Sequence, residues 1–407
     1  MAEKILILGG GQVAAHAAST IRKYDISSEV IVLSEESYLP YERPPLSKDF
    51  LLEKMNEEQC LFFNKDFYEK KNIQILNNEK IEVVDFINSK LHSKKNIFDF
   101  TKLLIATGNI NKKLKIDNID QNDIFYLRDF NESIKIKKKY NKSKNILIIG
   151  GGFIGLELTS SAIQLKKNVV VIEQGDQLMG RVVPKKIASI IQKKHEIKGV
   201  IFHLNTSVDY INKKNNAYEI NLKNKKKFTV DMIIVGIGAT PNTKIFDNTD
   251  LKIDNGIITN EYCQTSIPNI FAAGDVSNFY HPLYKTNIRL ESWKHAQNHG
   301  INAGKNIVNK RTIYEDIPWM WSDQYDLNLQ LTGMCSNFDT SAKRGLDEDE
   351  GIVYFFIKNR KIIGACGVGV KGKIGKDVRI AGKLAEKKIT VTKEILSNSL
   401  QKLNKLY

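Results

Sequence analysis

Short apolar runs that end in glycine recur along the chain and predict buried strands followed by turns. Two of them continue into segments with small residues near their start, which predict helices. The first, "KILILGGGQVAAHAASTIRK", begins at Lys4, and the second, "NILIIGGGFIGLELTSSAIQL", begins at Asn145. This strand–turn–helix order, found twice, predicts an α/β fold with two Rossmann-like dinucleotide-binding units.

Both turns carry the G-x-G-x-x-G/A pattern of dinucleotide-binding sites. Glycine allows the tight turn and lets the backbone approach a pyrophosphate, and the helix N-terminus supplies free N–H groups and partial positive charge. Two copies, each between a strand and a helix, form a much stronger signal than a single copy. The predicted phosphate-binding residues are Gly9, Gly11 and Ala14 in the first unit and Gly150, Gly152 and Gly155 in the second.

An acidic residue at the end of the next strand of such a unit binds a ribose hydroxyl, about 20 residues after the first glycine. The second unit reads "VVVIEQ" there and supplies Glu173. A carboxylate at this position repels a 2′-phosphate, so we expect NADH/NAD rather than the phosphorylated cofactor. The first unit reads "VIVLSEE", in which Ser34 takes the expected position and Glu35 follows it. We assign Glu35 to the adenosine ribose of the first dinucleotide.

Composition indicates a globular protein with more than one domain. The chain has 407 residues, of which 42% are hydrophobic and 26% charged, and this length exceeds one ordinary core. The formal net charge of +15 favours acidic partners. The lysines are scattered and no nucleic-acid-binding signature accompanies them, so we expect no nucleic acid as a partner. No apolar run reaches the ~18 residues that span a bilayer, so we expect no membrane association.

The cysteines predict neither disulfides nor a metal site. Cys60, Cys263, Cys335 and Cys366 lie far apart, and no Cys-x-x-Cys spacing occurs. Met1–Lys4 leads directly into the first predicted strand, which leaves no room for a signal peptide. We therefore expect a cytoplasmic protein.

Three further strands that stop at glycine complete a family pattern. They are "LLIATG" (103–108), "IIVGIGATPN" (233–242) and "FAAGDV" (271–276). Together with the two glycine turns they resemble the two-dinucleotide flavoprotein reductases. The resemblance implies that the first turn binds FAD, that the second binds NADH, and that a Gly-Asp motif binds the ribityl and pyrophosphate region of FAD. The additional cofactor-binding residues implied are Ala106, Thr107, Gly108, Gly236, Gly238 and Asp275.

The cysteine content and four longer segments narrow the resemblance to one branch. Disulfide reductases carry a cysteine pair beside the flavin, whereas Cys60 is the only cysteine before Cys263. The segments "PYERPPLSK", "GGGFIGLE", "RLESWKHAQNHG" and "PWMWSDQYD" resemble the ferredoxin–NAD(+) reductases of oxygenase systems essentially from end to end.

Several of these residues also have a plain structural interpretation. Proline restricts its own backbone and that of the preceding residue, so Glu42–Pro45 is predicted to be extended, as in a rigid surface loop before Lys48. Trp293 and Trp321 are compatible with core positions. His16 and His299 are expected to be packing or surface residues.

The resemblance gives five residues specific roles. It places Lys48 against the flavin near N5, where a fixed cation stabilises the charge that reduction adds. It pairs Glu157 with Lys48, which keeps the ammonium group charged and oriented. It also implies that Arg43 contacts the phosphate side of the cofactor, that Trp293 is a flavin-side contact, and that Trp321 lies near the electron exit.

We therefore expect three domains and one electron-transfer function. The FAD domain is predicted at 1–108 and 240–315, the NAD domain at 109–239, and a C-terminal α+β domain at 316–407. NADH delivers a hydride to FAD, and electrons then leave singly to an acidic [2Fe–2S] ferredoxin that serves a P450 or Rieske oxygenase. The lysine-rich segment 369–388 has the plain interpretation of a solvated face and is also the best candidate for docking this partner. No lysine or arginine lies between Trp321 and Leu331, so cationic contacts must come from elsewhere.

Three other functions remain open on the same scaffold. They are an NADH oxidase or peroxidase, a monodehydroascorbate-type reductase, and a flavoprotein of the apoptosis-inducing type that acts through protein contacts. Only an acceptor assay separates the enzymatic alternatives from the ferredoxin reductase.

Overall fold

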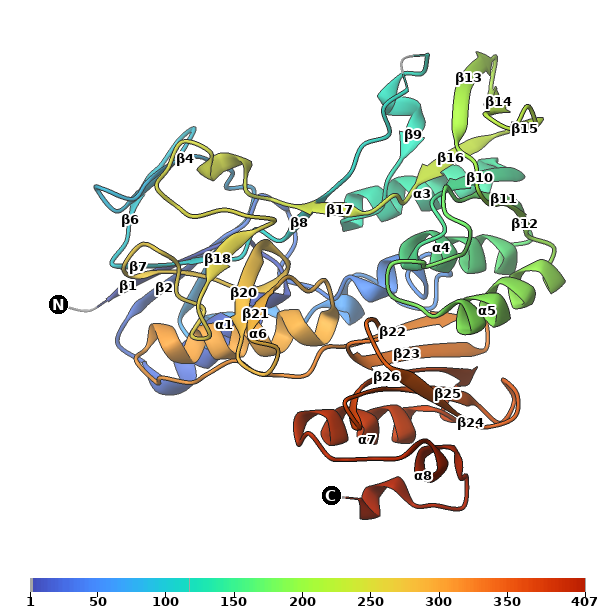
Figure 1. Cartoon of the computed structure of the whole chain (residues 1–407). Coiled ribbons are helices and arrows are strands. Elements are labelled where there is room, and N and C mark those ends of the chain that lie inside the picture. The colour runs from blue at the N-terminus through green and yellow to red at the C-terminus, as the bar shows by residue number, and fades with distance from the viewer. Residues whose placement is uncertain (1–2, 117, 407) are drawn as a thin grey trace. The chain divides into compact units, whose positions relative to one another are not determined.

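The structure is a computed structural model that describes residues 3–116 and 118–406, and these form two compact units (Figure 1). The first unit takes the described residues of Met1–Glu42, Asn56–Ile110 and Ala239–Asp316. The second takes those of Arg43–Met55, Asn111–Gly238 and Ile317–Tyr407. The short segment that contains Lys48 thus belongs to the second unit, although the sequence on both sides of it belongs to the first. The three-domain division remains a prediction.

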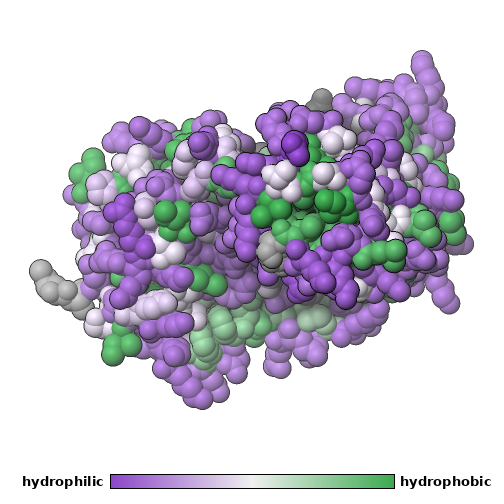
Figure 2. Space-filling model, turned by 60° about the horizontal axis from the view of Figure 1, so that its bottom comes forward, coloured by the Kyte–Doolittle hydropathy of each residue, from purple (hydrophilic) through white to green (hydrophobic). Residues whose placement is uncertain are grey.

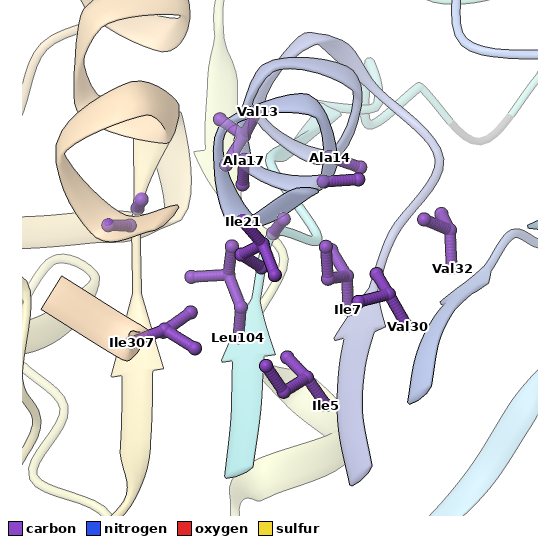
Figure 3. Packing of buried hydrophobic residues seen from close by; sticks show 14 of the residues in the cluster. Ile5, Ile7, Val13, Ala14, Ala17, Ile21, Val30, Val32, Leu104 and Ile307 are labelled. Carbon is purple, nitrogen blue, oxygen red and sulfur yellow. The ribbon is translucent and has the colours of Figure 1, made fainter. Parts of the chain in front are cut away.

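A five-stranded parallel sheet forms the centre of the first unit, in the order β19-β7-β1-β2-β3. The strands are β1 (Lys4–Leu8), β2 (Glu29–Leu33), β3 (Ile73–Leu76), β7 (Lys102–Ile105) and β19 (Ile270–Ala272). Side chains alternate between the two faces of a strand. Ile5 and Ile7 of β1 therefore join the core beneath helix α1 (Gln12–Tyr24), as Figure 3 shows, while Leu6 and Leu8 join a second core on the opposite face. Because both faces are covered, the strand reads as a continuous apolar run.

Helix α6 (Trp293–Ile307) packs against α1, and Ala303 and Ile307 belong to the same core. The remaining elements of this unit form small sheets and short helices. They are η2 (Glu58–Cys60), α2 (Lys65–Lys70), β4 (Ile81–Asp85), β5 (Lys90–Ser93), β6 (Ile97–Asp99), β8 (Asn109–Asn111), β17 (Ala239–Pro241), η4 (Lys244–Phe246), β18 (Ile257–Thr259), η5 (Gly274–Val276), β20 (Ser277–His281) and β21 (Thr286–Ile288).

A second five-stranded parallel sheet, in the order β12-β11-β10-β16-β9, forms part of the second unit. Its strands are β9 (Ile124–Phe125), β10 (Asn145–Ile149), β11 (Asn168–Ile172), β12 (Ile201–His203) and β16 (Met232–Val235). The helices are α3 (Phe130–Lys142), α4 (Phe153–Gln164) and α5 (Lys185–Ile197), with η1 (Pro44–Ser47) and η3 (Gln121–Asp123). A three-stranded antiparallel sheet consists of β13 (Val208–Lys214), β14 (Ala217–Leu222) and β15 (Lys227–Val230).

The C-terminal part of the second unit is a five-stranded antiparallel sheet in the order β22-β23-β26-β25-β24. Its elements are β22 (Trp319–Gln324), β23 (Leu327–Gly333), β24 (Thr340–Arg344), β25 (Ile352–Lys358), β26 (Lys361–Val370), α7 (Gly375–Glu386), α8 (Lys393–Ser397) and η6 (Leu403–Lys405). One face packs on α7, where Phe355 and Val378 share a core. The other face packs on residues of α4 and α5, including Leu156 and Ile187. Both faces of this antiparallel sheet are therefore packed against helices.

This architecture confirms the predicted fold class of two Rossmann-like parallel sheets with a C-terminal α+β domain. The face in Figure 2 is largely hydrophilic, with hydrophobic residues gathered in separate groups. Among residues 3–116 and 118–406, no helix combines the length and apolar character that crossing a membrane requires.

Candidate active site

The first glycine turn leaves an open helix N-terminus. Gly9 has a φ of +122°, and a Cβ there would lie 2.3 Å from the carbonyl oxygen of Ala106, so only glycine fits. Gly11 caps α1 in extended conformation without a side-chain capping bond, and the first turn of α1 has no acidic residue. A Cβ on Gly11 would meet nothing within 4 Å. The space and the free N–H groups fit a phosphate group.

The second glycine turn repeats this geometry. Gly150 has a φ of +108°, and a Cβ there would lie 2.4 Å from the carbonyl oxygen of Gly236. Gly155 lies against the backbone of Gly150, because an added Cβ would be 2.1 Å from that carbonyl oxygen. Gly152 caps α4 without a side-chain bond, and the first turn of α4 also lacks an acidic residue. The second turn therefore fits a second pyrophosphate.

The acidic residue of the second unit is fixed beside its glycine turn. One carboxylate oxygen of Glu173 accepts a hydrogen bond from the backbone N–H of Gly151, and the other accepts one from Gly175, both at 2.7 Å. Each oxygen retains a further lone pair for a ribose hydroxyl. Residues of these types in this arrangement fit the adenosine ribose of NAD.

The first unit differs at the equivalent position. A Cβ on Gly10 would lie 2.2 Å from Oγ of Ser34, so Ser34 stands where Glu173 stands in the second unit. The side chain of Glu35 is 64% exposed and lies 2.9 Å from the ammonium group of Lys80. The assignment of Glu35 to the FAD ribose remains a prediction.

Other predicted residues of the first unit lie after its parallel strands. Ala106 and Thr107 follow β7, and the Thr107 hydroxyl donates to the carbonyl oxygen of Asn242 at 2.8 Å. Asp275 lies in η5 and accepts a bond from the Asn109 amide at 3.3 Å. The predicted residues Gly108, with a φ of +64°, and Ala14, buried on α1, complete this group.

Trp293 joins the beginnings of two helices. It is the first residue of α6, and its carbonyl oxygen accepts a hydrogen bond of 2.9 Å from the side chain of Gln12, the first residue of α1. Trp293 therefore lies close to the first glycine turn.

His299 is buried and also forms a specific hydrogen bond, which a residue that only fills space would lack. It is buried on α6, and its Nδ1 accepts the backbone N–H of Gly274 at 3.1 Å, next to Asp275. Burial lowers the pKa of His299 well below its usual range, with a smaller effect from neighbouring His295. The neutral ring thus supports the Gly-Asp motif. His16, by contrast, packs against Phe62 as expected of a packing residue.

In the second unit, Gly236 and Gly238 follow β16. The Gly236 N–H donates to the carbonyl oxygen of Ile149 at 2.8 Å, and Gly238 has a φ of +103°. The carbonyl oxygen of Gly238 accepts from Lys112 at 3.0 Å. Both glycines shape the chain at the carboxyl ends of β10 and β16, where ligands bind in such sheets.

The segment before Lys48 is helical, so the prediction of an extended Glu42–Pro45 is wrong. Arg43 has right-handed helical backbone angles, and Pro44–Ser47 form the 3-10 helix η1. Proline is compatible with the first turn of a helix, because the N–H groups it lacks have no partner there. The segment is not a surface loop either, since Pro45, Leu46 and Ser47 are buried.

Two serine hydroxyl groups fix this segment from neighbouring helices. Ser133 of α3 donates to the carbonyl oxygen of Leu46 at 2.8 Å, and Ser161 of α4 donates to that of Ser47 at 2.7 Å. The side chain of Arg43 donates to the carbonyl oxygen of Arg128. Lys48 therefore starts from a backbone that is held in place.

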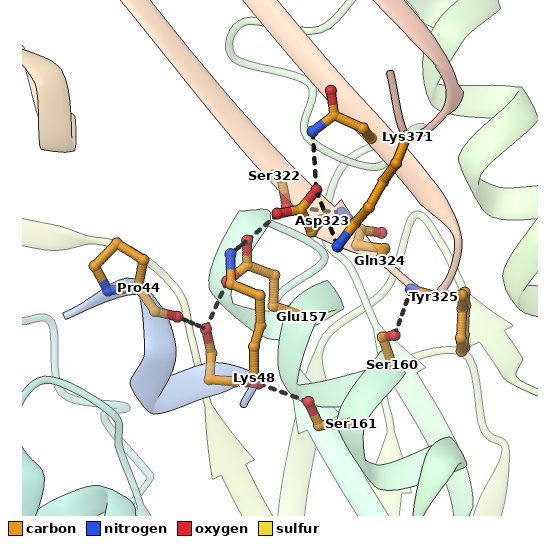
Figure 4. Close-up of polar contacts among 12 residues, drawn as sticks. Pro44, Lys48, Glu157, Ser160, Ser161, Ser322, Asp323, Gln324, Tyr325 and Lys371 are labelled. Atoms are coloured by element: carbon orange, nitrogen blue, oxygen red, sulfur yellow. Dashed lines mark hydrogen bonds and ion pairs between the residues drawn. The ribbon is translucent and has the colours of Figure 1, made fainter. Parts of the chain in front are cut away.

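Lys48 and Glu157 form a buried ion pair. Nζ of Lys48 lies 3.0 Å from Oε1 of Glu157 on α4, and their side chains are 16% and 6% exposed. The hydroxyl of Ser322 donates to the same Oε1 at 2.7 Å, and that of Ser47 donates to Oε2 at 2.5 Å. Figure 4 shows these contacts around the carboxylate. Trp321 lies beside them, with its ring centroid 5.8 Å from Nζ of Lys48.

The structure thus brings together Lys48, Glu157 and Trp321, the three predicted catalytic residues. Ser47 and Ser322 were not among the residues predicted from the sequence. Both lie inside the quoted segments "PPLSK" and "WSDQ", each directly beside a predicted residue. Their position next to Lys48 and Trp321 was the only available signal.

Two further observations on the described residues concern possible metal ligands and the cysteines. Within the described residues, no group of three or more histidine, cysteine or acidic side chains is arranged to hold a metal ion. No disulfide joins any of the four cysteines, and burial raises the pKa of Cys335 to about 12. Burial also raises the pKa of Cys263 and Cys366 well above the usual range, and a thiol with a raised pKa is a poor nucleophile.

Two glycine turns that fit a pyrophosphate, with an acidic residue beside one of them, are the features expected of a two-dinucleotide oxidoreductase. The comparisons with known proteins agree with this class. A family profile described as pyridine nucleotide-disulphide oxidoreductase matches residues 3–300, and one described as reductase C-terminal matches residues 319–407. The chain belongs to the pyridine nucleotide-disulphide oxidoreductase family. The family uses FAD and NAD(H), which confirms the predicted cofactors.

Two relatives illustrate the similarity. The chain is 32% identical to the 3-phenylpropionate/cinnamic acid dioxygenase ferredoxin–NAD(+) reductase component of Photorhabdus laumondii, over 90% of this chain and 93% of the relative. It is 31% identical to a rubredoxin–NAD(+) reductase of Ectopseudomonas oleovorans, over 82% of this chain and 88% of the relative.

Solved structures of reductases are also similar to this chain. A ferredoxin reductase for the CYP199A2 system of Rhodopseudomonas palustris has a TM-score of 0.94 and 28% identity, over 99% of both chains. The putidaredoxin reductase in a covalent complex with putidaredoxin has a TM-score of 0.93 and 24% identity, over 99% of this chain and 98% of that one, and shows the same fold. The predicted resemblance to ferredoxin–NAD(+) reductases is thereby confirmed.

Proposed function

We propose that the protein is an NADH-dependent FAD reductase that passes electrons to a [2Fe–2S] ferredoxin serving a P450 or Rieske oxygenase. The observation that carries this proposal is similarity along almost the whole chain to reductase components of dioxygenase systems, including a match to the reductase C-terminal family. Cys60 is the only cysteine before Cys263, so the closely spaced cysteine pair of disulfide reductases is missing from the sequence, which supports the same conclusion. FAD, when bound, takes up a hydride from NADH and releases the electrons one at a time.

The two glycine turns divide the cofactors between them in this proposal. The N–H groups at the start of α1 hold the FAD pyrophosphate, and those at the start of α4 hold the NAD pyrophosphate. Glu173 binds the ribose hydroxyls of NAD and rejects a 2′-phosphate. Asp275, supported by Asn109 and by the neighbouring Gly274–His299 bond, binds the ribityl region of FAD.

Lys48 supplies positive charge where reduction adds negative charge to the flavin. Its ammonium group is pre-positioned by the η1 backbone and by Glu157, so little reorganisation is needed during the reaction. Glu157 accepts bonds from Lys48, Ser322 and Ser47, which hold the carboxylate in one orientation. Catalysis in this proposal is positioning and electrostatics, with no side chain acting as acid or base.

Trp321 lies near the electron exit, and basic residues attract the partner. Trp321 stacks on Trp319, with ring centroids 5.3 Å apart, so its orientation is restrained. The lysine-rich segment 369–388 contains α7 and is the proposed docking region for an acidic ferredoxin. We place the protein in the cytoplasm, where proteins rarely contain disulfides, since no disulfide joins its four cysteines.

A rubredoxin is a second candidate acceptor. The rubredoxin–NAD(+) reductase relatives are 31% identical to the chain, almost as similar as the 32% of the dioxygenase component. This observation favours testing both kinds of iron protein.

The test is an acceptor assay with the FAD-loaded enzyme. NADH oxidation is measured with a [2Fe–2S] ferredoxin, with a rubredoxin, with monodehydroascorbate, and with oxygen alone. Fast, saturable turnover with the ferredoxin and slow turnover with oxygen supports the proposal. Saturable turnover with rubredoxin only moves the function to the second candidate. Fast turnover with oxygen or monodehydroascorbate alone overturns the ferredoxin assignment.

A further inference from the structure

A chain of hydrogen bonds extends from Glu157 through the interior of the second unit. Beyond the Ser322 hydroxyl, the side-chain amide of Gln324 donates to Oγ of Ser322 at 3.2 Å. The amide oxygen of Gln324 lies 2.8 Å from Nε2 of His195, and Nδ1 of His195 lies 2.9 Å from the hydroxyl of Tyr325. Figure 4 labels Glu157, Ser322, Gln324 and Tyr325, four members of this chain.

The members of this chain from Glu157 to His195 are shielded from solvent, and Tyr325 at its far end is partly buried. His195 on α5 is fully buried, and Ser322, Gln324 and Glu157 are at most a few per cent exposed. Buried polar groups must find partners in the protein, because water does not reach them. A change in one member is therefore passed to its neighbour instead of being compensated by solvent.

With a neutral His195 ring, one assignment of protons satisfies every bond of this series. The ionised Glu157 carboxylate can only accept, so Ser322 spends its single hydroxyl proton on it. Oγ of Ser322 then accepts from the amide N–H of Gln324, which leaves the Gln324 oxygen to accept from His195. Nε2 of His195 must carry the proton, and Nδ1 accepts the proton of Tyr325. Each hydrogen bond of this series is therefore donated in the direction that leads from Tyr325 to Glu157.

We propose that His195 is a positioning residue for the Lys48–Glu157 pair. With its proton on Nε2, the neutral ring fixes the amide of Gln324, which turns the Ser322 hydroxyl onto Glu157 and holds the carboxylate against Lys48. The surroundings support a neutral ring, because burial lowers the pKa of His195 to about 4. The catalytic part of this inference rests on the proposed function.

The chain also links the position of Trp321 to the ion pair. Ser322 and Gln324 belong to β22, the strand that carries Trp321. The bonds to Glu157 and to His195 hold this strand at two points two residues apart. His195 therefore restrains the strand at the proposed electron exit as well as the carboxylate.

The experiment compares His195→Phe, which removes both ring nitrogens at similar volume, with His195→Gln, whose amide can still donate to Gln324. Tyr140→Phe is the matched control. Tyr140 is buried on α3 and donates to the carbonyl oxygen of Leu158, next to Glu157 in sequence, but lies outside the chain of bonds. The FAD-loaded variants are measured for the flavin midpoint potential, the rate of flavin reduction by NADH, and the unfolding temperature.

We expect His195→Phe to lower the midpoint potential and to slow flavin reduction about threefold or more, as for residues coupled in one network. His195→Gln should restore most of both quantities, and Tyr140→Phe should lower only the unfolding temperature. In a Glu157→Gln background, adding His195→Phe should have little further effect on the potential. Equal effects in both backgrounds, or a loss of stability with an unchanged potential, would overturn the inference.

The potential separates this inference from the proposed function, because it is titrated with dyes and needs neither NADH nor a ferredoxin. If NADH fails as a donor while the potential still depends on His195 through Glu157, only the proposed function fails. If His195→Phe does not fold, nitrogen NMR of the unmodified enzyme decides. A proton on Nε2 at pH 7 with no titration above pH 5 supports the inference, and a proton on Nδ1 or titration near pH 6.5 overturns it.

Discussion

Nζ of Lys48 lies 3.0 Å from Oε1 of Glu157, and both side chains are largely shielded from solvent. Removing two opposite charges from water costs about as much as their attraction returns, so a buried ion pair is weak support for a stabilising role. The residues around this pair are nevertheless arranged to hold it, with two serine hydroxyl groups on the carboxylate. Because these bonds hold the ion pair in one position, they favour a functional role for the Lys48 ammonium group.

Replacement of Lys48 tests that role. Lys48→Met should make the flavin harder to reduce and slow its reduction by NADH, because the fixed positive charge is lost while the glycine turns still bind FAD. Stopped-flow reduction rates and a redox titration measure both effects. Lys54→Met, at an exposed lysine nearby, is the control and should change neither quantity. If Lys48→Met also changes neither, the segment serves only to connect secondary-structure elements.

Cofactor choice tests Glu173. Its carboxylate is fixed by the N–H groups of Gly151 and Gly175, so it cannot turn away from a 2′-phosphate. We expect at least a tenfold preference for NADH over NADPH in kcat/KM, equivalent to ~1.4 kcal/mol. Glu173→Gln should reduce this preference, while Glu196→Gln, at an exposed position on α5, should preserve it. Comparable kcat/KM values for the two cofactors with the unmodified enzyme would contradict the prediction.

The sequence predicted those features whose signal is local. The glycine turns could be recognised because strand, turn and helix follow one another within about 20 residues, and because the close approach of Gly150 to its neighbours excludes every other residue type. The two parallel sheets followed from continuous apolar runs such as that of β1, which are needed when both faces are covered.

The contacts that complete the site depend on distant parts of the chain. Ser322 bonds to Glu157 and His195 bonds to Gln324 from distant parts of the chain, and the sequence around each residue does not indicate its partner. The prediction of an extended segment, based on the prolines before Lys48, was wrong for a related reason. Their local preference for extended backbone was overridden by the bonds from Ser133 and Ser161, which fix a helical turn.

Acid should destabilise the fold through its buried histidines. Burial lowers the pKa of His195 to about 4 and that of His295 to about 3, from an ordinary value near 6.5. Below pH 6.5 the unfolded chain therefore binds protons that the folded chain does not, so the stability present above pH 6.5 is lost as the pH falls toward 4. Urea unfolding of the FAD-loaded enzyme should give a lower free energy of unfolding at pH 5 than at pH 7.

The variant His195→Phe provides the control for this pH effect. It removes one of the groups responsible, so its free energy of unfolding should fall less between pH 7 and pH 5 than that of the unmodified enzyme. An unchanged free energy of unfolding across this range, or the same fall in the variant, would show that the histidines do not cause it.

Salt should weaken the interaction with the electron acceptor. The chain has a formal net charge of +15, and attraction between a basic protein and an acidic partner is screened over about 8 Å at physiological ionic strength. The KM for an acidic ferredoxin should therefore rise with salt, whereas the rate of flavin reduction by NADH should change much less. A salt-independent KM would mean that the positive charge has no part in docking.

Replacement of Trp321 separates the two half-reactions. The ring stacks on Trp319 and lies beside Lys48, so Trp321→Ala removes aromatic area at the proposed contact between enzyme and partner. Hydride transfer from NADH does not use this area and should stay near normal, while ferredoxin reduction should fall several-fold, as for an aromatic anchor at an interface. Trp321→Phe keeps a ring and should retain most of the activity, and Phe338→Ala, at a partly exposed aromatic elsewhere in the C-terminal sheet region, should affect neither step. Stopped-flow measurement of each half-reaction decides between the roles, because equal losses in both would make Trp321 a general packing residue.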